Sequence, residues 1–171
     1  MSEAIALWKT AHIISAAILF GTGLGTAFFC WFGYRNALRA DEIGALRATL
    51  GLTVIADACF IAPAVMFQAA SGVVLMILLG WPHISSWSIA VWSLFIFVGA
   101  CWLPVVAIQL RLKREAEQAS SIAALSKEFH RQFHIWFALG IPAFAAVVAI
   151  FYLMVAKPLS IARFATSLAA G

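Results

Sequence analysis

The stretch WKTAHIISAAILFGTGLGTAFFCW, residues 8–31, decides the fold of this chain. It is almost wholly apolar over the roughly 20 residues that a helix needs to cross a bilayer. Trp8 and Trp31 lie near its ends, where tryptophan side chains anchor a helix at the membrane–water interfaces. Lys9 and His12 lie near its beginning, and a histidine within a span is expected to face protein rather than lipid. The stretch therefore predicts a membrane helix whose histidine faces the interior of a helix bundle.

The composition supports a membrane protein and excludes several soluble classes. Hydrophobic residues make up 64% of the chain and the mean hydropathy is +1.00, which is more apolar surface than a soluble domain of 171 residues can bury. The formal charge of +4 does not indicate nucleic-acid binding, because the basic residues lie at the ends of apolar runs rather than in a patch. The three cysteines lie inside apolar runs and form no disulfide framework, CxxCH motif or zinc motif.

Apolar runs of membrane-spanning length recur along the chain. We expect one transmembrane domain over residues 1–171, an all-α four-helix bundle that ends in a tail at residues 157–171. Gly21 and Gly25 form a GxxxG pattern in the first span, which permits close approach of a neighbouring helix or of a membrane partner, including a second copy. The four expected spans cover about residues 4–32, 51–80, 87–110 and 133–156.

The basic residues predict the orientation of the bundle. Residues 34–50 are expected to form a short surface helix or loop, and residues 111–131 a polar, helix-like connector. By the positive-inside rule, both connectors are cytoplasmic and both termini lie on the outer side of a bacterial inner membrane. The connectors hold Arg35, Arg39, Arg47, Arg111, Lys113, Arg114, Lys127 and Arg131, whereas the opposite side holds Lys9, Lys157 and Arg163.

His12 is the first candidate for a cofactor ligand. Lys9, His12 and Ala16 share one helix face, which continues to Leu19 and Gly23. A groove of small residues beneath a histidine suits a flat macrocycle such as haem b, with the iron bound through a ring nitrogen. On the residues alone, a histidine that hydrogen-bonds a neighbouring helix is the more ordinary interpretation.

Residues of the second span and of the outer half of the bundle would complete such a site. Gln68, Ser71 and Gly72 are expected to line it from the second span. His134 is too far from His12 to share one iron, since the two lie about 20–30 Å apart along the membrane normal. The candidates for a second axial ligand are His83, Met76, Met154 and Lys9, and a five-coordinate iron is the alternative.

Asp57 is the one acidic residue inside any expected span. Asp57, Gln68 and Gly72 lie close to one helix face, and such a stripe predicts a polar cavity or a proton path. The alternative is a structural clamp near the inner interface, in which Asp57 pairs with Arg47 or Arg131.

His130 and His134 are four residues apart and therefore face the same way on a helix. This spacing can bind a metal ion, with Asp57 the nearest candidate for a third ligand. Because Glu128, Arg131 and Gln132 surround the pair with polar side chains, the end of a helix at the interface is the other interpretation.

Two sequence segments resemble a known group of proteins. The segments CWLPVV at residues 101–106 and WFALGIP at residues 136–142 are typical of a group of small bacterial integral membrane proteins of unknown function. The likeness covers nearly all of the chain. It implies a helical membrane bundle.

The two ends also resemble the HemJ-type membrane protoporphyrinogen oxidases. The matching features are Lys9-x-x-His12 at the first span and the stop at residues 155–158, Val-Ala-Lys-Pro. The resemblance implies that His12 corresponds to the histidine taken to ligate haem b in that family. The oxidases carry an arginine late in the first span and a histidine soon after, whereas Arg35 here lies past the span and no histidine follows. The resemblance thus favours haem binding over porphyrinogen oxidation.

The leading interpretation is a bundle that binds haem b at His12 and acts in electron transfer or oxidoreduction, which would make it a possible haem-dependent enzyme. A second interpretation is a cofactor-free structural or partner subunit of a membrane complex. A third is a small transporter or proton path along Asp57, Gln68 and His134.

Overall fold

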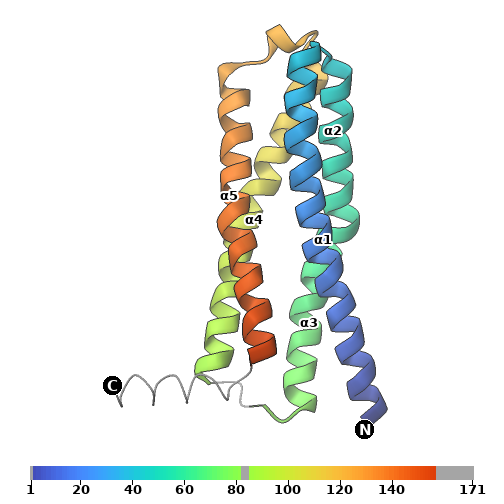
Figure 1. Cartoon of the computed structure of the whole chain (residues 1–171), viewed down its shortest axis with the longest axis vertical. Helices are drawn as coiled ribbons and strands as arrows, with labels where there is room; N and C mark the ends of the chain where they lie inside the picture. The colour runs from blue at the N-terminus through green and yellow to red at the C-terminus, as the bar shows by residue number, and fades with distance from the viewer. Residues whose placement is uncertain (1, 82–84, 157–171) are drawn as a thin grey trace, which may run out of the picture.

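The computed structural model describes residues 2–81 and 85–156, and these residues are helical almost throughout, with no strand among them. Four of its helical rods are long and apolar enough to cross a membrane, and they run alternately up and down (Figure 1). The prediction of an all-α transmembrane bundle is therefore confirmed. In chain order the elements are α1 (Ser2–Ala40), α2 (Ile43–Ala56), η1 (Asp57–Ile61), α3 (Ala62–Leu78), α4 (Ser86–Gln118), η2 (Ile122–Ala124) and α5 (Lys127–Ala156), with α2, η1 and α3 forming one continuous rod.

The best-packed core lies at the connector end, the end of the bundle that holds the α1–α2 turn and the α4–α5 connection (Figure 1). The expected surface helix or loop at residues 34–50 does not form, because α1 continues to Ala40 and α2 begins at Ile43. All four rods extend beyond their membrane-spanning stretches at the connector end. Apolar residues at helical spacing in these extensions let the rods bury a common core. Its buried members are Cys30, Tyr34, Ala37, Leu46, Leu50, Leu112, Ala116, Ala119, Leu125, Phe129, Phe133 and Trp136.

The close approach between α1 and α2 occurs at Gly33. A Cβ atom added there would lie 2.7 Å from side-chain atoms of Thr49. By contrast, a Cβ atom added at Gly21, Gly23 or Gly25 would meet no atom within 4 Å in the described part of the chain. No helix in the described part of the chain therefore packs closely on the Gly21–Gly25 face, and the expectation of a membrane partner or a second copy there stays a prediction.

Asp57 begins a single π-helical turn inside the second rod. The backbone N–H of Ala62 bonds to the carbonyl of Asp57, five residues earlier. Pro63 explains this turn, because proline has no N–H for the carbonyl four residues back and its ring crowds that carbonyl. π-Turns of this kind often occur at functional sites.

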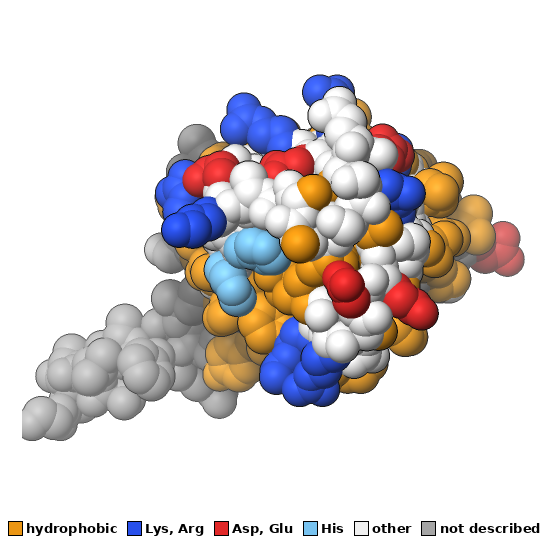
Figure 2. Space-filling model, turned by 90° about the horizontal axis from the view of Figure 1, so that it is seen from above, with side chains coloured by type: hydrophobic (Ala, Val, Ile, Leu, Met, Phe, Trp, Pro, Cys, Tyr) orange, Lys and Arg blue, Asp and Glu red, His pale blue; other side chains and the backbone are white. Residues whose placement is uncertain are grey.

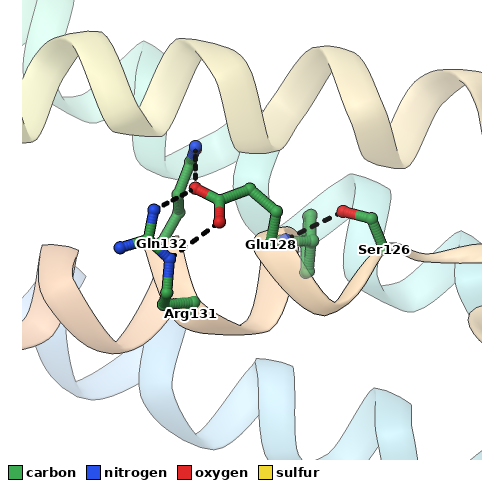
Figure 3. Close-up of polar contacts among 5 residues, drawn as sticks. Ser126, Glu128, Arg131 and Gln132 are labelled. Atoms are coloured by element: carbon green, nitrogen blue, oxygen red, sulfur yellow. Dashed lines mark hydrogen bonds and ion pairs between the residues drawn. The ribbon is translucent and has the colours of Figure 1, made fainter.

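The start of α5 is capped by Ser126, the residue just before the helix begins. The Ser126 hydroxyl accepts a hydrogen bond from the Phe129 backbone N–H at 3.0 Å. Glu128 accepts hydrogen bonds from Arg131 and Gln132, three and four residues further along the helix (Figure 3). The Ser126 bond satisfies a backbone N–H at the helix end, and the Glu128 carboxylate in the first turn complements the helix dipole.

At the terminal end, where α1 begins and α5 ends, the rods separate into two pairs (Figure 1). Stacking of Trp8 on Phe67 joins α1 to α3. The Trp87 indole N–H donates to the Leu153 carbonyl at 2.8 Å and joins α4 to α5. A cavity lies between the two pairs.

Candidate functional site: an intramembrane cavity beside His12

The cavity measures about 380 Å³ and is lined by side chains from all four rods. Its walls are overwhelmingly apolar, and it is partly open to its surroundings. Glycine and aromatic residues stand among its aliphatic lining residues, including Phe20, Gly23, Phe95, Gly99, Phe137, Gly140 and Phe144. Stacking of Phe20 on Phe144, with ring centres 4.6 Å apart, closes the gap between α1 and α5. Because the lining lies within the membrane-crossing helices, a molecule that enters from the side comes from the bilayer.

Three of the predicted cofactor-binding residues meet His12 directly. The Nδ1 atom of His12 lies 2.6 Å from the Ser71 hydroxyl oxygen. The Gln68 side-chain amide donates to the backbone carbonyl of His12 at 2.7 Å. A Cβ atom added at Gly72 would lie 3.8 Å from the His12 ring, so the glycine leaves the ring an ordinary contact distance. The structure therefore brings Gln68, Ser71 and Gly72 to His12 at the α1–α3 contact.

The hydrogen bonds of Ser71 determine which nitrogen of His12 carries the proton. Besides His12 Nδ1, the Ser71 hydroxyl lies 2.6 Å from the backbone carbonyl of Phe67. A carbonyl can only accept, so the single hydroxyl proton points to Phe67. The Ser71 oxygen then accepts from an Nδ1–H of His12. In a neutral imidazole this leaves Nε2 with the free electron pair that binds metals.

His12 lies at the margin of the cavity. Ala16, Leu19 and Gly23, which follow His12 on the same helix face, all line the cavity, as does Gln68. His12 is not itself part of the lining, and its side chain is half-buried. The helical periodicity of the first span thus places the histidine about one turn beyond the row of residues that forms one cavity wall.

The opposite end of the cavity carries a buried polar chain at Asp57. The Gln109 side chain hydrogen-bonds the Asp57 carboxyl group. The Gln109 side-chain oxygen in turn accepts from the Trp136 indole N–H at 3.2 Å. Asp57 and Gln68 both line the cavity, as the stripe on the second rod predicts. Gln109 lies in an apolar run of α4, and its pairing with Asp57 could not be read from helical spacing.

The alternative role for Asp57, a clamp with an arginine, is wrong. Arg47 instead donates to the backbone carbonyls of Ala116 and Ala119, at 2.9 and 2.6 Å. Arg131 pairs with Glu128. Both arginines therefore stabilise helix ends at the connector end, where unpaired carbonyls and carboxylates attract them.

His130 and His134 lie at the connector end, away from the cavity. Charged side chains gather around this end, with histidine side chains at one edge (Figure 2). The Tyr34 hydroxyl lies 2.6 Å from His130 Nδ1, while His134 is exposed with its ring edge toward Trp31. Within residues 2–81 and 85–156, no three histidine, cysteine or acidic residues converge as metal ligands. A metal site built from this pair and Asp57 is therefore not formed.

The candidates for a second axial ligand of His12-bound haem differ in exposure. Lys9 is exposed, one turn nearer the terminal end than His12. Met76 is buried in α3 and Met154 is half-buried in α5. His83 lies outside the described residues, as does the tail at residues 157–171.

Trp102 is a residue of the cavity that sequence reasoning missed. Its ring lines the cavity, and its buried indole N–H has no hydrogen-bond acceptor among the described residues. A tryptophan inside an apolar run is ordinary core by composition alone, so no sequence signal distinguishes it.

Comparison with known proteins identifies the chain at the level of a family. The model of a family described as "Predicted integral membrane protein (DUF2269)" matches residues 6–158. No curated protein and no solved structure matches the chain. The match agrees with the likeness seen at residues 101–106 and 136–142. The likeness to the HemJ-type oxidases has no counterpart in these comparisons.

Proposed function

The chain belongs to this family of integral membrane proteins, and from that premise we propose that it binds haem b through His12 and takes part in electron transfer or oxidoreduction. The proposal concerns one site, the His12–Ser71 pair with the apolar cavity beside it. The observation that carries it is the hydrogen bond between His12 Nδ1 and Ser71.

That hydrogen bond prepares His12 to act as an axial ligand. Protein histidines that bind metals almost always donate their second ring N–H to an oxygen, which holds the ring in one tautomer and one orientation. Ser71 supplies this oxygen, because its own proton is directed to the Phe67 carbonyl. The Gln68 amide holds the backbone of His12 against α3 one turn away. The ring is thus positioned by residues that do not themselves bind a metal.

The cavity supports the proposal through its shape and polarity. A haem group is flat and largely apolar, and the cavity offers aromatic faces and glycine backbones in the membrane interior. When bound, the haem supplies one-electron chemistry, with a potential set by its axial ligands and by burial. The apolar walls exclude water from the group, and exposed Lys9 is available to a propionate at the terminal end.

A titration of the purified protein tests this proposal. Haemin is added to the protein in phosphatidylcholine nanodiscs, and the growth and position of the Soret band report binding. We expect one haem per chain, loss of the ligated spectrum in His12→Ala, and an unchanged spectrum in His134→Ala, whose exposed histidine is the matched control. Equal binding by the parent and by His12→Ala, with both folded, would refute ligation by His12.

The alternative of a cofactor-free partner subunit has one observation in its favour. Within the described residues, the Gly21–Gly25 stretch has no atom within 4 Å of where a Cβ would lie. Such a face could receive a helix of another membrane protein. A colourless, folded parent protein that co-purifies with one membrane protein, and loses it on Gly25→Leu, would favour this alternative.

A further inference from the structure

The indole N–H of Trp102, a residue of the cavity lining, is a buried donor with no hydrogen-bond acceptor among the described residues. Four other lining residues have a protein partner for their polar side chain: Thr26 donates to backbone carbonyls of α1, Asp57 meets Gln109, Gln68 donates to His12, and Trp136 donates to Gln109. The Trp102 Nε1 atom is buried, and no acceptor for it exists among the described residues. A buried donor without an acceptor is costly, so a molecule that brings an acceptor oxygen to it gains binding free energy.

The position of Trp102 limits where that oxygen can come from. Trp102 lies 16 residues after the start of α4 at Ser86, which is about 24 Å along the helix axis. It also lies two turns before Gln109, toward the terminal end. Trp102 is therefore near the middle of its span, beyond the level of phospholipid ester groups. The acceptor has to belong to a molecule that is itself soluble in the hydrocarbon interior.

The walls around Trp102 select a flat molecule. Phe95, Phe137 and Phe144 line the same cavity together with the Trp102 ring. Aromatic faces favour stacking on a planar ring, whereas an acyl chain would fill the space and leave the indole N–H unpaired. Because the lining is almost wholly apolar, it also excludes a ligand that carries a charged group inside the cavity, where that group would lose its hydration without compensation.

We infer that the cavity binds a lipid-soluble quinone-type molecule, a planar ring with carbonyl oxygens and an apolar tail, through a hydrogen bond from Trp102. The indole N–H donates to one carbonyl oxygen, and the aromatic residues contact the ring. The cavity is partly open, so the apolar tail can extend out of it among the membrane-crossing helices. This inference goes beyond haem binding and does not depend on it, because its donor Trp102 makes no hydrogen bond to His12 in the described structure. Haem and the quinone would both use this cavity, so the quinone is tested on haem-free protein.

The test uses decylubiquinone as the probe, and decylbenzene as a matched compound that keeps the ring and tail but has no carbonyl oxygens. Both are titrated by calorimetry into detergent-solubilised, haem-free protein. We expect the parent to prefer decylubiquinone. Trp102→Phe keeps an aromatic face and removes the donor, so it should weaken decylubiquinone binding about 5- to 10-fold and leave decylbenzene binding unchanged.

Trp92→Phe is the matched control, since Trp92 lies on the same helix and does not line the cavity. It should bind decylubiquinone within about twofold of the parent. His12→Ala should also retain binding, which separates this inference from the haem proposal. Equal affinity of Trp102→Phe and the parent would overturn the inference. If Trp102→Phe does not fold, the parent protein alone tests the inference. Equal affinity of the parent for decylubiquinone and decylbenzene would overturn it as well.

Discussion

The Nδ1 atom of His12 lies 2.6 Å from the hydroxyl oxygen of Ser71, a residue 59 positions further along the chain. The contact joins α1 to α3 at the terminal end, where the two helix pairs separate around the cavity. It also leaves Nε2 of His12 with the free electron pair, because the Ser71 proton is directed to Phe67. One hydrogen bond thus has a structural consequence and a chemical one, and variants can separate the two.

Ser71→Ala should lower the stability of the protein by about 0.5–1.5 kcal/mol, the range for a buried side-chain hydrogen bond in a membrane protein. Ser71 is fully buried, so no water replaces the lost oxygen. The same change should weaken haemin binding several-fold, because the imidazole loses its fixed orientation. Thermal unfolding in detergent and haemin titration measure the two effects. Ser93→Ala, at an exposed position of α4, should change neither.

Gly33→Ala should destabilise the bundle by about 1–3 kcal/mol relative to Gly25→Ala. Both changes gain helix propensity, but only the Cβ at residue 33 would lie 2.7 Å from Thr49, whose branched side chain is stiff. Unfolding in denaturant measures the difference. Adding Thr49→Ala should recover most of the loss, and a double variant no more stable than Gly33→Ala alone would contradict the contact.

Arg47→Lys should loosen the connection between α4 and α5. Arginine donates from two nitrogens to the carbonyls of Ala116 and Ala119, whereas a lysine ammonium cannot reproduce that fork. We expect a loss of about 1–3 kcal/mol and faster amide hydrogen exchange at residues 119–126. Arg39→Lys, at an exposed position of α1, is the control. Unchanged exchange at residues 119–126 would show that Arg47 does not hold this connection.

Tyr34→Phe should cost about 1 kcal/mol, because it removes the hydroxyl that lies 2.6 Å from His130 Nδ1 while keeping the ring in the core. Tyr152→Phe should be neutral, since Tyr152 is 68% exposed. Thermal unfolding compares the two variants. Spectra with haemin should be unaffected by either change, because His130 lies at the connector end, and a change with Tyr34→Phe would contradict this separation.

The sequence predicts the bundle because apolar runs of bilayer length have one stable arrangement in lipid, a set of helices. It also predicts the row of residues from Ala16 to Gly23 that follows His12 and lines one wall, since helical periodicity alone places them on one face. Other features depend on what a neighbouring helix presents. Gly25 and Gly33 look alike in the sequence, and only the position of Thr49 makes Gly33 the point of close approach.

The hydrogen-bonded chain at Asp57 also depends on neighbouring helices and so could not be predicted from the sequence. Gln109 and Trp136 come from two other helices, and their hydrogen bonds exist only once the rods are packed. The indole N–H of Trp102 is buried and meets no acceptor among the described residues, which is a property of the assembled cavity. The continuation of α1 and α2 through residues 34–50 was missed because charged residues there cover a helix face opposite a buried one.

The most direct test of the haem proposal is a reduced-minus-oxidised absorption spectrum of the protein purified from haem-supplemented cells, recorded beside His12→Ala. The account predicts a b-type spectrum with about one haem per chain in the parent, and its loss in a folded His12→Ala variant. A folded parent with no such spectrum, or a variant that retains it, would contradict the role assigned to His12.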